Sequence, residues 1–276
     1  MTEDDDAFIR AVVDNPGVDL PRLVYADWLD DRSDPRGPFL RAEVEWAQPW
    51  KEGKRPGDAT GLRVMAANLD TLWVARICRP PLGVCCDQLE LFGFGPRLAI
   101  ADVREAERRL DVRFPDEYVA FVLNYNGFFT TGRGPYPPSH QQVPCRSYSL
   151  HDGWTFGSLG NVHRFQLRED DLFPDAIPFV DFLPTLVEPV ENWLARFVYI
   201  GHDPDCIGGF FLGIAQANLG EIRVLDTSVE IESGVRFNQH ETPHSVNLPT
   251  LLANLPAIPP RPDALRLDDP EIDIPF

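Results

Sequence analysis

The hydrophobic pattern of this chain changes from helical spacing in its first third to strand-like runs in its last third. Apolar side chains such as Ile9, Val12 and Val13 recur at the three- to four-residue spacing of an amphipathic helix. From residue 197 onward they form short runs, at 197–200, 209–214 and 221–226, that are separated by polar turns. We therefore expect an α+β fold, with a mostly antiparallel or mixed sheet flanked by helices.

The first 80 residues are expected to form a small helical domain. Short helices are predicted over residues 6–48, because the turn residues Asn15-Pro16-Gly17 end one helix and Pro21 can begin the next. A polar loop is expected at 49–61, followed by one closing helix over 62–77. The prolines at 80 and 81 end this pattern.

A second domain is expected over residues 97–255. Asp102 can cap a helix that runs to Leu110, and Asp111 then stands where a chain often enters the left-handed region. Pro115 can begin a second helix, which Asn126-Gly127 ends. Beyond the predicted strands we expect a final helix over 246–255 and an acidic, proline-rich tail over 256–276.

The charge balance restricts the partners that this protein can bind. The chain has 43 acidic and 25 basic residues, a formal net charge of −18. This excess of acid argues against a protein that binds the nucleic-acid backbone or an anionic membrane surface, and it permits a basic protein partner. No stretch reaches the ~18 apolar residues that span a bilayer, and the acidic start is unlike a secretory leader, so we expect a cytoplasmic protein. Five cysteines in a chain of this length do not predict a disulfide framework.

Two segments carry resemblances to known families. The first resembles the repeat-companion domain that is common in planctomycete proteins and is carried by residues 19–31, 34–37 and 39–43. The resemblance implies such a domain at about 1–48 and a bacterial origin for the protein. That family has no activity that the resemblance could imply for this chain. Its motif residues in this chain are expected to be structural: Arg22, Tyr25, Asp27 and Trp28.

Residues 103–127 resemble the opening of the SUKH superfamily (Smi/Knr-like), which includes immunity proteins of bacterial toxin systems. The matching positions include Glu107, Pro115, Tyr118, Asn126 and Gly127. Two turn positions depart from the pattern, because Asp111 and Phe128 stand where glycine is usual. For Glu107, between core positions, we expect a structural ion pair or a hydrogen bond to a turn. The resemblance covers 97–255, but its first thirty residues are the distinctive part.

The SUKH resemblance implies a protein-binding module without catalysis or cofactor. Its partner would be a basic protein, such as a nuclease-type toxin whose cleft must be positive to hold phosphates. Carboxylates on exposed turns could cover such a cleft, and the candidates are Glu169, Asp170, Asp171, Asp203 and Asp205. The alternative is a regulatory or scaffold protein with no toxin partner.

A third hypothesis is a metal-dependent hydrolase. The segment from His240 through Glu241 to His244 has the letters of a zinc-protease motif, whose two histidines must share one helix face. Pro243 would break that helix, so we expect loop histidines and no metal site. The adjacent Cys85 and Cys86 lack a second pair and are expected to be buried small side chains.

Overall fold

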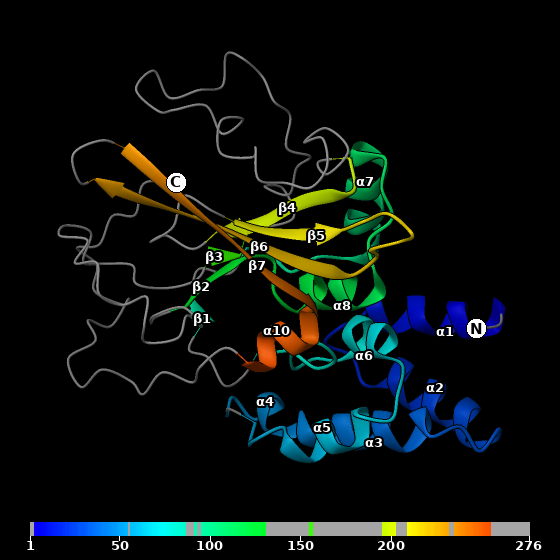
Figure 1. The fold of residues 1–276 in the computed structure, drawn as a ribbon. Helices are drawn as coiled ribbons and strands as arrows, with labels where there is room; N and C mark the ends of the chain where they lie inside the picture. Colours follow the sequence, from blue (N-terminus) through cyan, green and yellow to red (C-terminus); the bar gives the residue numbers. More distant parts are fainter. Residues whose placement is uncertain are drawn as a thin grey trace.

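Six helices form the N-terminal part of the protein. The computed structural model describes residues 3–54, 56–86, 91–92, 95–130, 155–156, 195–202, 209–231 and 235–254. The helices are α1 (Glu3–Val13), α2 (Leu20–Asp30), α3 (Arg36–Trp46), α4 (Gln48–Lys51), α5 (Thr60–Ala66) and α6 (Thr71–Ile77). They lie together below the sheet in Figure 1. Their core includes Ile9, Tyr25, Leu29, Phe39, Leu40 and Trp73.

A sheet with flanking helices follows, and the α+β prediction is confirmed. The helices are α7 (Ile100–Leu110), α8 (Asp116–Asn124) and α10 (Leu248–Asn254). The strands are β1 (Leu91–Phe92), β2 (Phe128–Thr130), β3 (Thr155–Phe156), β4 (Phe197–His202), β5 (Gly209–Gly213), β6 (Glu221–Ile231) and β7 (Val235–Asn247). They pair in chain order, and every pairing is antiparallel. In the described part of the chain, no helix combines the length and the apolar character that crossing a membrane requires.

The prediction of one closing helix over 62–77 is wrong. Two short helices, α5 and α6, share this segment, and Asp70 stands between them with an extended backbone. The Asp70 carboxylate accepts a hydrogen bond of 2.6 Å from the backbone N–H of Trp73, so it caps the first turn of α6. Helix α4 also overlaps residues 49–61, the segment expected to be a loop.

The role predicted for Asp102 is also corrected. Helix α7 begins at Ile100, so Asp102 lies in its first turn rather than before it. Its carboxylate accepts a hydrogen bond of 2.7 Å from the backbone N–H of Ala99, the residue that precedes the helix. The left-handed turn at Asp111 is confirmed, with φ 52° and ψ 51°.

Alternating side chains of the central strands fill the core against the helices. In the β4–β5 pair Val198 lies opposite Leu212, and in the β5–β6 pair Leu212 lies opposite Ile222. These side chains join Ile200 and Phe210 in one cluster with residues of α7, α8 and α10. The two-residue period of a strand places this set on one face of the sheet.

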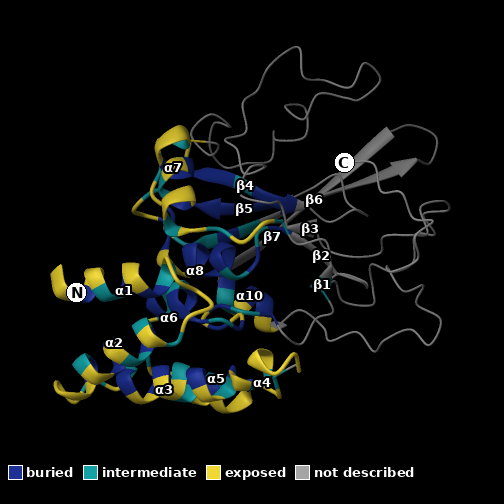
Figure 2. Cartoon of the chain, turned by 180° about the vertical axis from the view of Figure 1, so that it is seen from behind, coloured by how far each residue is buried: buried dark blue, intermediate teal, exposed yellow. Residues whose placement is uncertain are grey.

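Helix α8 is buried over most of its length, and only Asp116 and Glu117 in its first turn are exposed. Its residues from Tyr118 to Leu123 are all buried, as Figure 2 shows. A helix that is apolar all round belongs inside a fold. Helix α6 contributes Ala75 to the core of the sheet and Trp73 and Ile77 to the core of the N-terminal helices. The two cores therefore share one helix.

The segment that carries the two histidines is a strand. Strand β7 includes His240, Glu241 and His244, whose backbone alone is described. Its pairing with β6 shifts around Pro243, because Ile222 pairs with Val246 whereas Val224 pairs with Thr242. Proline cannot donate a ladder hydrogen bond, which favours a bulge at this position. The helix that the zinc-protease motif requires is not formed here.

Candidate functional site

An open hollow of about 570 Å³ lies beside the turn between α7 and α8. Three arginines from this region line it: Arg104, Arg108 and Arg113. Two acidic residues, Glu107 and Asp111, line it as well. Apolar side chains complete the wall, with Val112 from the turn and Ala195, Ile214 and Ala215 from the ends of β4 and β5. The hollow therefore joins the most distinctive part of the sequence to the ends of two interior strands of the sheet.

Glu107 holds the turn beside this hollow together. Its side chain is almost fully buried, and one carboxylate oxygen accepts a hydrogen bond of 2.9 Å from the backbone N–H of Phe114. The other oxygen lies 2.7 Å from a guanidinium nitrogen of Arg104 and 3.3 Å from one of Arg113. A buried carboxylate needs such partners, because an unpaired charge is costly away from water.

The backbone closes the same turn. The N–H of Val112 donates a hydrogen bond of 3.0 Å to the carbonyl of Glu107, across the left-handed residue Asp111. Aspartate tolerates this conformation better than most residues, although glycine adopts it at lower cost. The departure from the usual glycine thus leaves the path of the turn intact.

The other SUKH-like motif residues surround α8. Pro115 precedes its first residue, and Tyr118 is buried in the core, where burial raises the pKa of its hydroxyl. The Asn126 side chain donates a hydrogen bond of 2.8 Å to the carbonyl of Pro96. Gly127 has a φ of 76°, a left-handed value that favours glycine. These contacts fix where the chain enters and leaves the helix.

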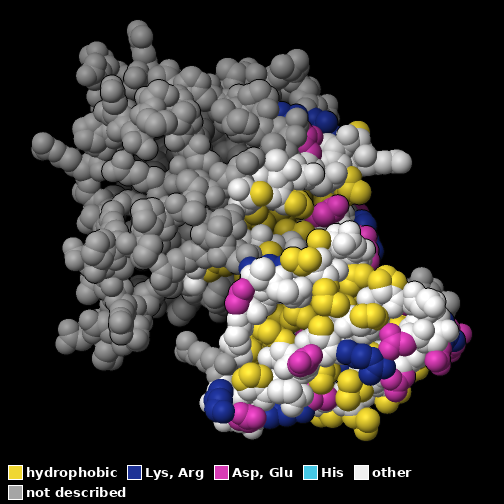
Figure 3. Space-filling view, turned by 90° about the horizontal axis from the view of Figure 1, so that it is seen from below, with side chains coloured by type: hydrophobic (Ala, Val, Ile, Leu, Met, Phe, Trp, Pro, Cys, Tyr) yellow, Lys and Arg dark blue, Asp and Glu magenta, His cyan; other side chains and the backbone are white. Residues whose placement is uncertain are grey.

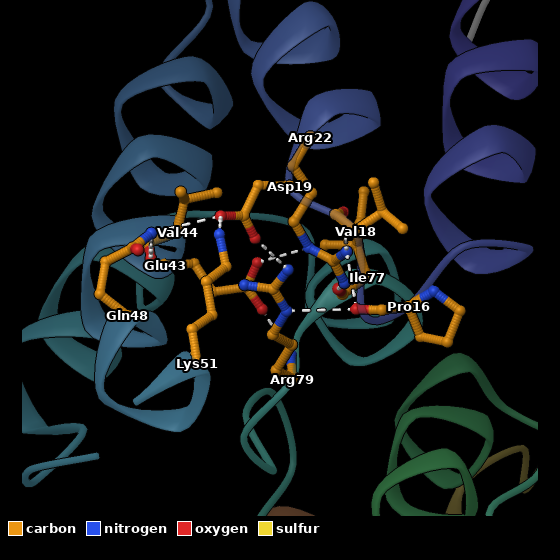
Figure 4. A network of polar contacts seen from close by, with 10 residues as sticks. All are labelled: Pro16, Val18, Asp19, Arg22, Glu43, Val44, Gln48, Lys51, Ile77 and Arg79. Carbon is orange, nitrogen blue, oxygen red and sulfur yellow. Dashed lines mark hydrogen bonds and ion pairs between the residues drawn. The ribbon is translucent and has the colours of Figure 1, made fainter. Parts of the chain in front are cut away.

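A second polar network connects α2 and α3 in the N-terminal part (Figure 4). Arg22 and Glu43 form a buried ion pair of 2.9 Å, and Arg22 also donates to the carbonyls of Pro16 and Ile77. Burial lowers the pKa of Arg22, and the nearby Glu43 acts against that shift. The motif arginine is therefore enclosed in the fold.

Asp19 extends this network toward the surface. Its carboxylate accepts hydrogen bonds from Lys51, Gln48 and Arg79, and the contact with Arg79 measures 2.6 Å. Burial alone would raise the pKa of Asp19, but these donors outweigh it and hold the pKa below its usual value.

Tyr25 connects α2 to α1 and α6. Its hydroxyl donates to the buried carboxylate of Asp5 and accepts a hydrogen bond of 3.2 Å from the indole of Trp73. Arg36 lies 3.1 Å from Asp5 and donates to the same hydroxyl. Burial, followed by the hydrogen bond to Asp5, raises the pKa of Tyr25. Such a closed set of partners fits a structural role.

The two remaining motif residues of α2 lie nearer to solvent. The exposed side chain of Asp27 pairs with Arg41, which also lies 2.8 Å from Asp30. The guanidinium of Arg32 stacks over the Trp28 ring at 3.8 Å. Exposed contacts of this kind add little to stability.

Hydrophobic side chains are exposed on the N-terminal helices. Seen from below, they gather over the surface of this part (Figure 3). The large exposed ones are Val18, Leu20, Val24, Trp50, Val64 and Met65. Apolar patches of this kind commonly mark surfaces that other proteins cover.

The acidic residues predicted to bind a partner lie outside the described residues. They are Glu169, Asp170, Asp171, Asp203 and Asp205. Within the described residues, no group of three or more histidine, cysteine, aspartate or glutamate side chains could hold a metal ion. Of the two adjacent cysteines, Cys86 is buried and Cys85 is partly buried.

The comparisons with known proteins bear on the sheet and its helices. Residues 98–225 match the model of the SMI1 / KNR4 family (SUKH-1). This SUKH-type segment begins just before α7 and ends within β6, so it includes the hollow and Glu107. Neither the curated proteins nor the solved structures contain a match to the chain.

Sequence reasoning missed the arginines of the hollow. All three fall within residues 104–113, which also hold Arg109, so this short segment has four arginines in a chain of strong negative charge. This local concentration was the available signal. The sequence could not show that the ends of β4 and β5 complete the wall.

Proposed function

We propose that the chain is a protein-binding module of the SUKH type and that it performs no catalysis. The match of residues 98–225 to the SUKH-1 family model carries this proposal. The buried polar networks around Glu107, Arg22 and Tyr25 support it, because their groups are engaged in holding helices together. The cytoplasm is the compartment we propose for it.

The partner that suits this module is a protein with a basic surface. The net charge of −18 favours fast association with such a partner through electrostatic steering. A nuclease-type toxin has the required basic cleft, and neutralising it would make the chain an immunity protein. The carboxylates proposed to cover that cleft are Glu169, Asp170, Asp171, Asp203 and Asp205.

A regulatory or scaffold role is the second candidate. The exposed hydrophobic side chains of the N-terminal helices favour it, since they offer a docking surface away from the SUKH-type segment. These helices include the segment that resembles a repeat-companion domain. A toxin partner would not be needed for this role.

Affinity capture in the native cells tests the proposal. The tagged full-length chain is captured at low and at moderate salt, and each retained protein is purified and titrated by calorimetry. We expect a basic protein that binds one to one, with an affinity that falls as salt rises. A retained basic nuclease whose activity is blocked supports the immunity role. Stoichiometric binding of an acidic or neutral protein supports the scaffold role, and absence of any stoichiometric partner contradicts both.

A charge-matched pair of variants locates the contact. One variant replaces the five candidate carboxylates with the corresponding amides. The control replaces five exposed acids of α1 and of the turns that follow α1 and α2 in the same way, at Glu3, Asp4, Asp6, Asp14 and Asp31. We expect the first variant to lose at least tenfold in affinity for the basic partner and the control to lose less than threefold. Equal losses would mean that net charge alone guides binding.

A further inference from the structure

The hollow beside the α7–α8 turn has more hydrogen-bond donors than its neighbours use. Arg104 and Arg113 share a single carboxylate oxygen of Glu107. Arg108 pairs with Glu105, and both side chains of that pair are exposed. A guanidinium has five N–H donors, so most of the donors on these three arginines have no acceptor in the described part of the chain.

The exposure of these arginines makes their donors accessible. The side chains of Arg108 and Arg113 are 73% and 61% exposed, and that of Arg104 is 32% exposed. Arg113 is held at one end by Glu107, which limits its rotation. A partly fixed guanidinium loses less conformational entropy when it binds a second acceptor.

Charge and shape both favour a monovalent acid. Residues 104–113, which form this side of the hollow, carry four arginines and three acids, an excess of one positive charge, while the chain is strongly negative. A carboxylate matches that excess, and its two oxygens can accept parallel hydrogen bonds from one guanidinium. The apolar wall of Val112 and Ile214 suits the hydrocarbon part of a side chain next to the acid.

We propose that this hollow binds a glutamate or aspartate carboxylate of an acidic peptide segment, with apolar neighbours of that residue against Val112 and Ile214. Arg113 and Arg108 donate to the carboxylate, and the Glu107–Arg104 pair positions Arg113. This site goes beyond the proposed function, because it has the opposite charge preference from the acidic surface and does not depend on it. A partner protein could use both surfaces.

A defined peptide pair tests the site on the full-length chain. The probe is an acetylated peptide of alternating leucine and glutamate, and its control has glutamine in place of glutamate. Binding is followed by calorimetry and by amide chemical shifts of residues 104–114 and 214–215. We expect micromolar to millimolar binding of the acidic peptide and at least tenfold weaker binding of the control. Equal binding of the two peptides, or no binding of the acidic one, would overturn the proposal.

Matched variants separate the site from general electrostatics. Arg113→Gln should weaken peptide binding at least tenfold, and Arg113→Lys should weaken it severalfold, since lysine keeps the charge without the planar fork. Arg10→Gln, at an exposed arginine of α1, should leave binding unchanged. A loss with Arg10→Gln equal to that with Arg113→Gln would contradict the site. The urea midpoint of each variant shows whether it is folded.

Inorganic phosphate and a short single-stranded DNA test whether the hollow prefers phosphate groups to carboxylates. We expect either to bind at least tenfold more weakly than the acidic peptide at the same ionic strength. Binding of phosphate or DNA as tight as that of the peptide, and lost with Arg113→Gln, would overturn the assignment to carboxylates and indicate a phosphate site.

Discussion

The Glu107 carboxylate accepts a hydrogen bond of 2.9 Å from the backbone N–H of Phe114 and so joins the end of α7 to the start of α8. The acceptor and the donor lie seven residues apart, and both are buried. The same carboxylate holds two arginines at the hollow. One buried acid therefore fixes the turn and positions the side chains that face solvent beside it.

Removal of this carboxylate should destabilise the protein. Glu107→Ala leaves the Phe114 N–H buried without an acceptor, and we expect a loss of about 2 to 3 kcal/mol in the free energy of unfolding. Glu107→Gln retains an acceptor and should lose about 1 kcal/mol. Urea unfolding measures both. The exposed Glu105→Gln should change stability by less than about 0.5 kcal/mol, and a similar loss at both positions would contradict the role of Glu107.

The left-handed turn at Asp111 leads to a second prediction. A β-branched side chain is strained in this region, so Asp111→Val should lower the free energy of unfolding by about 1 to 2 kcal/mol. Asp111→Gly should stay within about 0.5 kcal/mol of the parent, because glycine adopts this conformation freely. Urea midpoints of the two variants test the difference. Equal stability of the valine and glycine variants would mean that the turn is not held left-handed in solution.

The buried pair of Arg22 and Glu43 leads to a third prediction. Glu43→Ala leaves the Arg22 guanidinium buried without its carboxylate, and we expect a loss of about 3 to 5 kcal/mol. The double variant Arg22→Met with Glu43→Leu should recover most of this loss, because it removes both charges. Thermal and urea unfolding give the values. A double variant as unstable as Glu43→Ala would show that the other contacts of Arg22, to backbone carbonyls, dominate.

The lowered pKa of Asp19 leads to the prediction that the stability of the protein depends on pH. Its folded pKa is lowered, so its stabilising contribution is present above the unfolded pKa of about 4 and is lost as the pH falls through the folded value. Asp19→Asn should therefore cost more stability at pH 7 than at pH 3. Unfolding curves across this range measure the effect, and Asp14→Asn, at an exposed aspartate, provides the control. A cost that does not change with pH would contradict the lowered pKa.

Local chemistry explains which elements the sequence could predict. The turn at Asp111 and the start of α8 after Pro115 depend on backbone preferences of the residues themselves, so they can be recognised in the chain. The break between α5 and α6 depended on Asp70 acting as a cap, and it was missed inside an apolar pattern that continues across it.

The networks and the hollow depend on distant contacts. Arg22 and Glu43 are 21 residues apart, and Arg36 and Asp5 are 31 apart. No local pattern specifies which acid a given arginine meets, because packing of the helices decides it. The hollow likewise requires residues near 104–113 to meet the ends of β4 and β5, about a hundred residues later. Only the concentration of arginine was visible beforehand.

The sharing of α6 predicts that both cores unfold together. Ala75 of α6 packs in the core of the sheet, Trp73 packs in that of the N-terminal helices, and Asn124 donates hydrogen bonds to the carbonyls of Leu82 and Val84. Phe39→Ala and Phe210→Ala, one in each core, should each cost about 3 to 5 kcal/mol. Each variant should unfold in a single transition with a lowered midpoint, because loss of either core removes packing contacts of α6.

Hydrogen exchange read by mass spectrometry distinguishes coupled from separate unfolding. In each variant we expect protection to fall in peptides from both α3 and α8, whichever core carries the substitution. A calorimetric scan should keep one peak, with the midpoint lowered by several degrees. Loss of protection confined to α3 in the Phe39→Ala variant, with α8 unchanged, would show that the N-terminal helices and the sheet unfold as separate units in spite of the helix that they share.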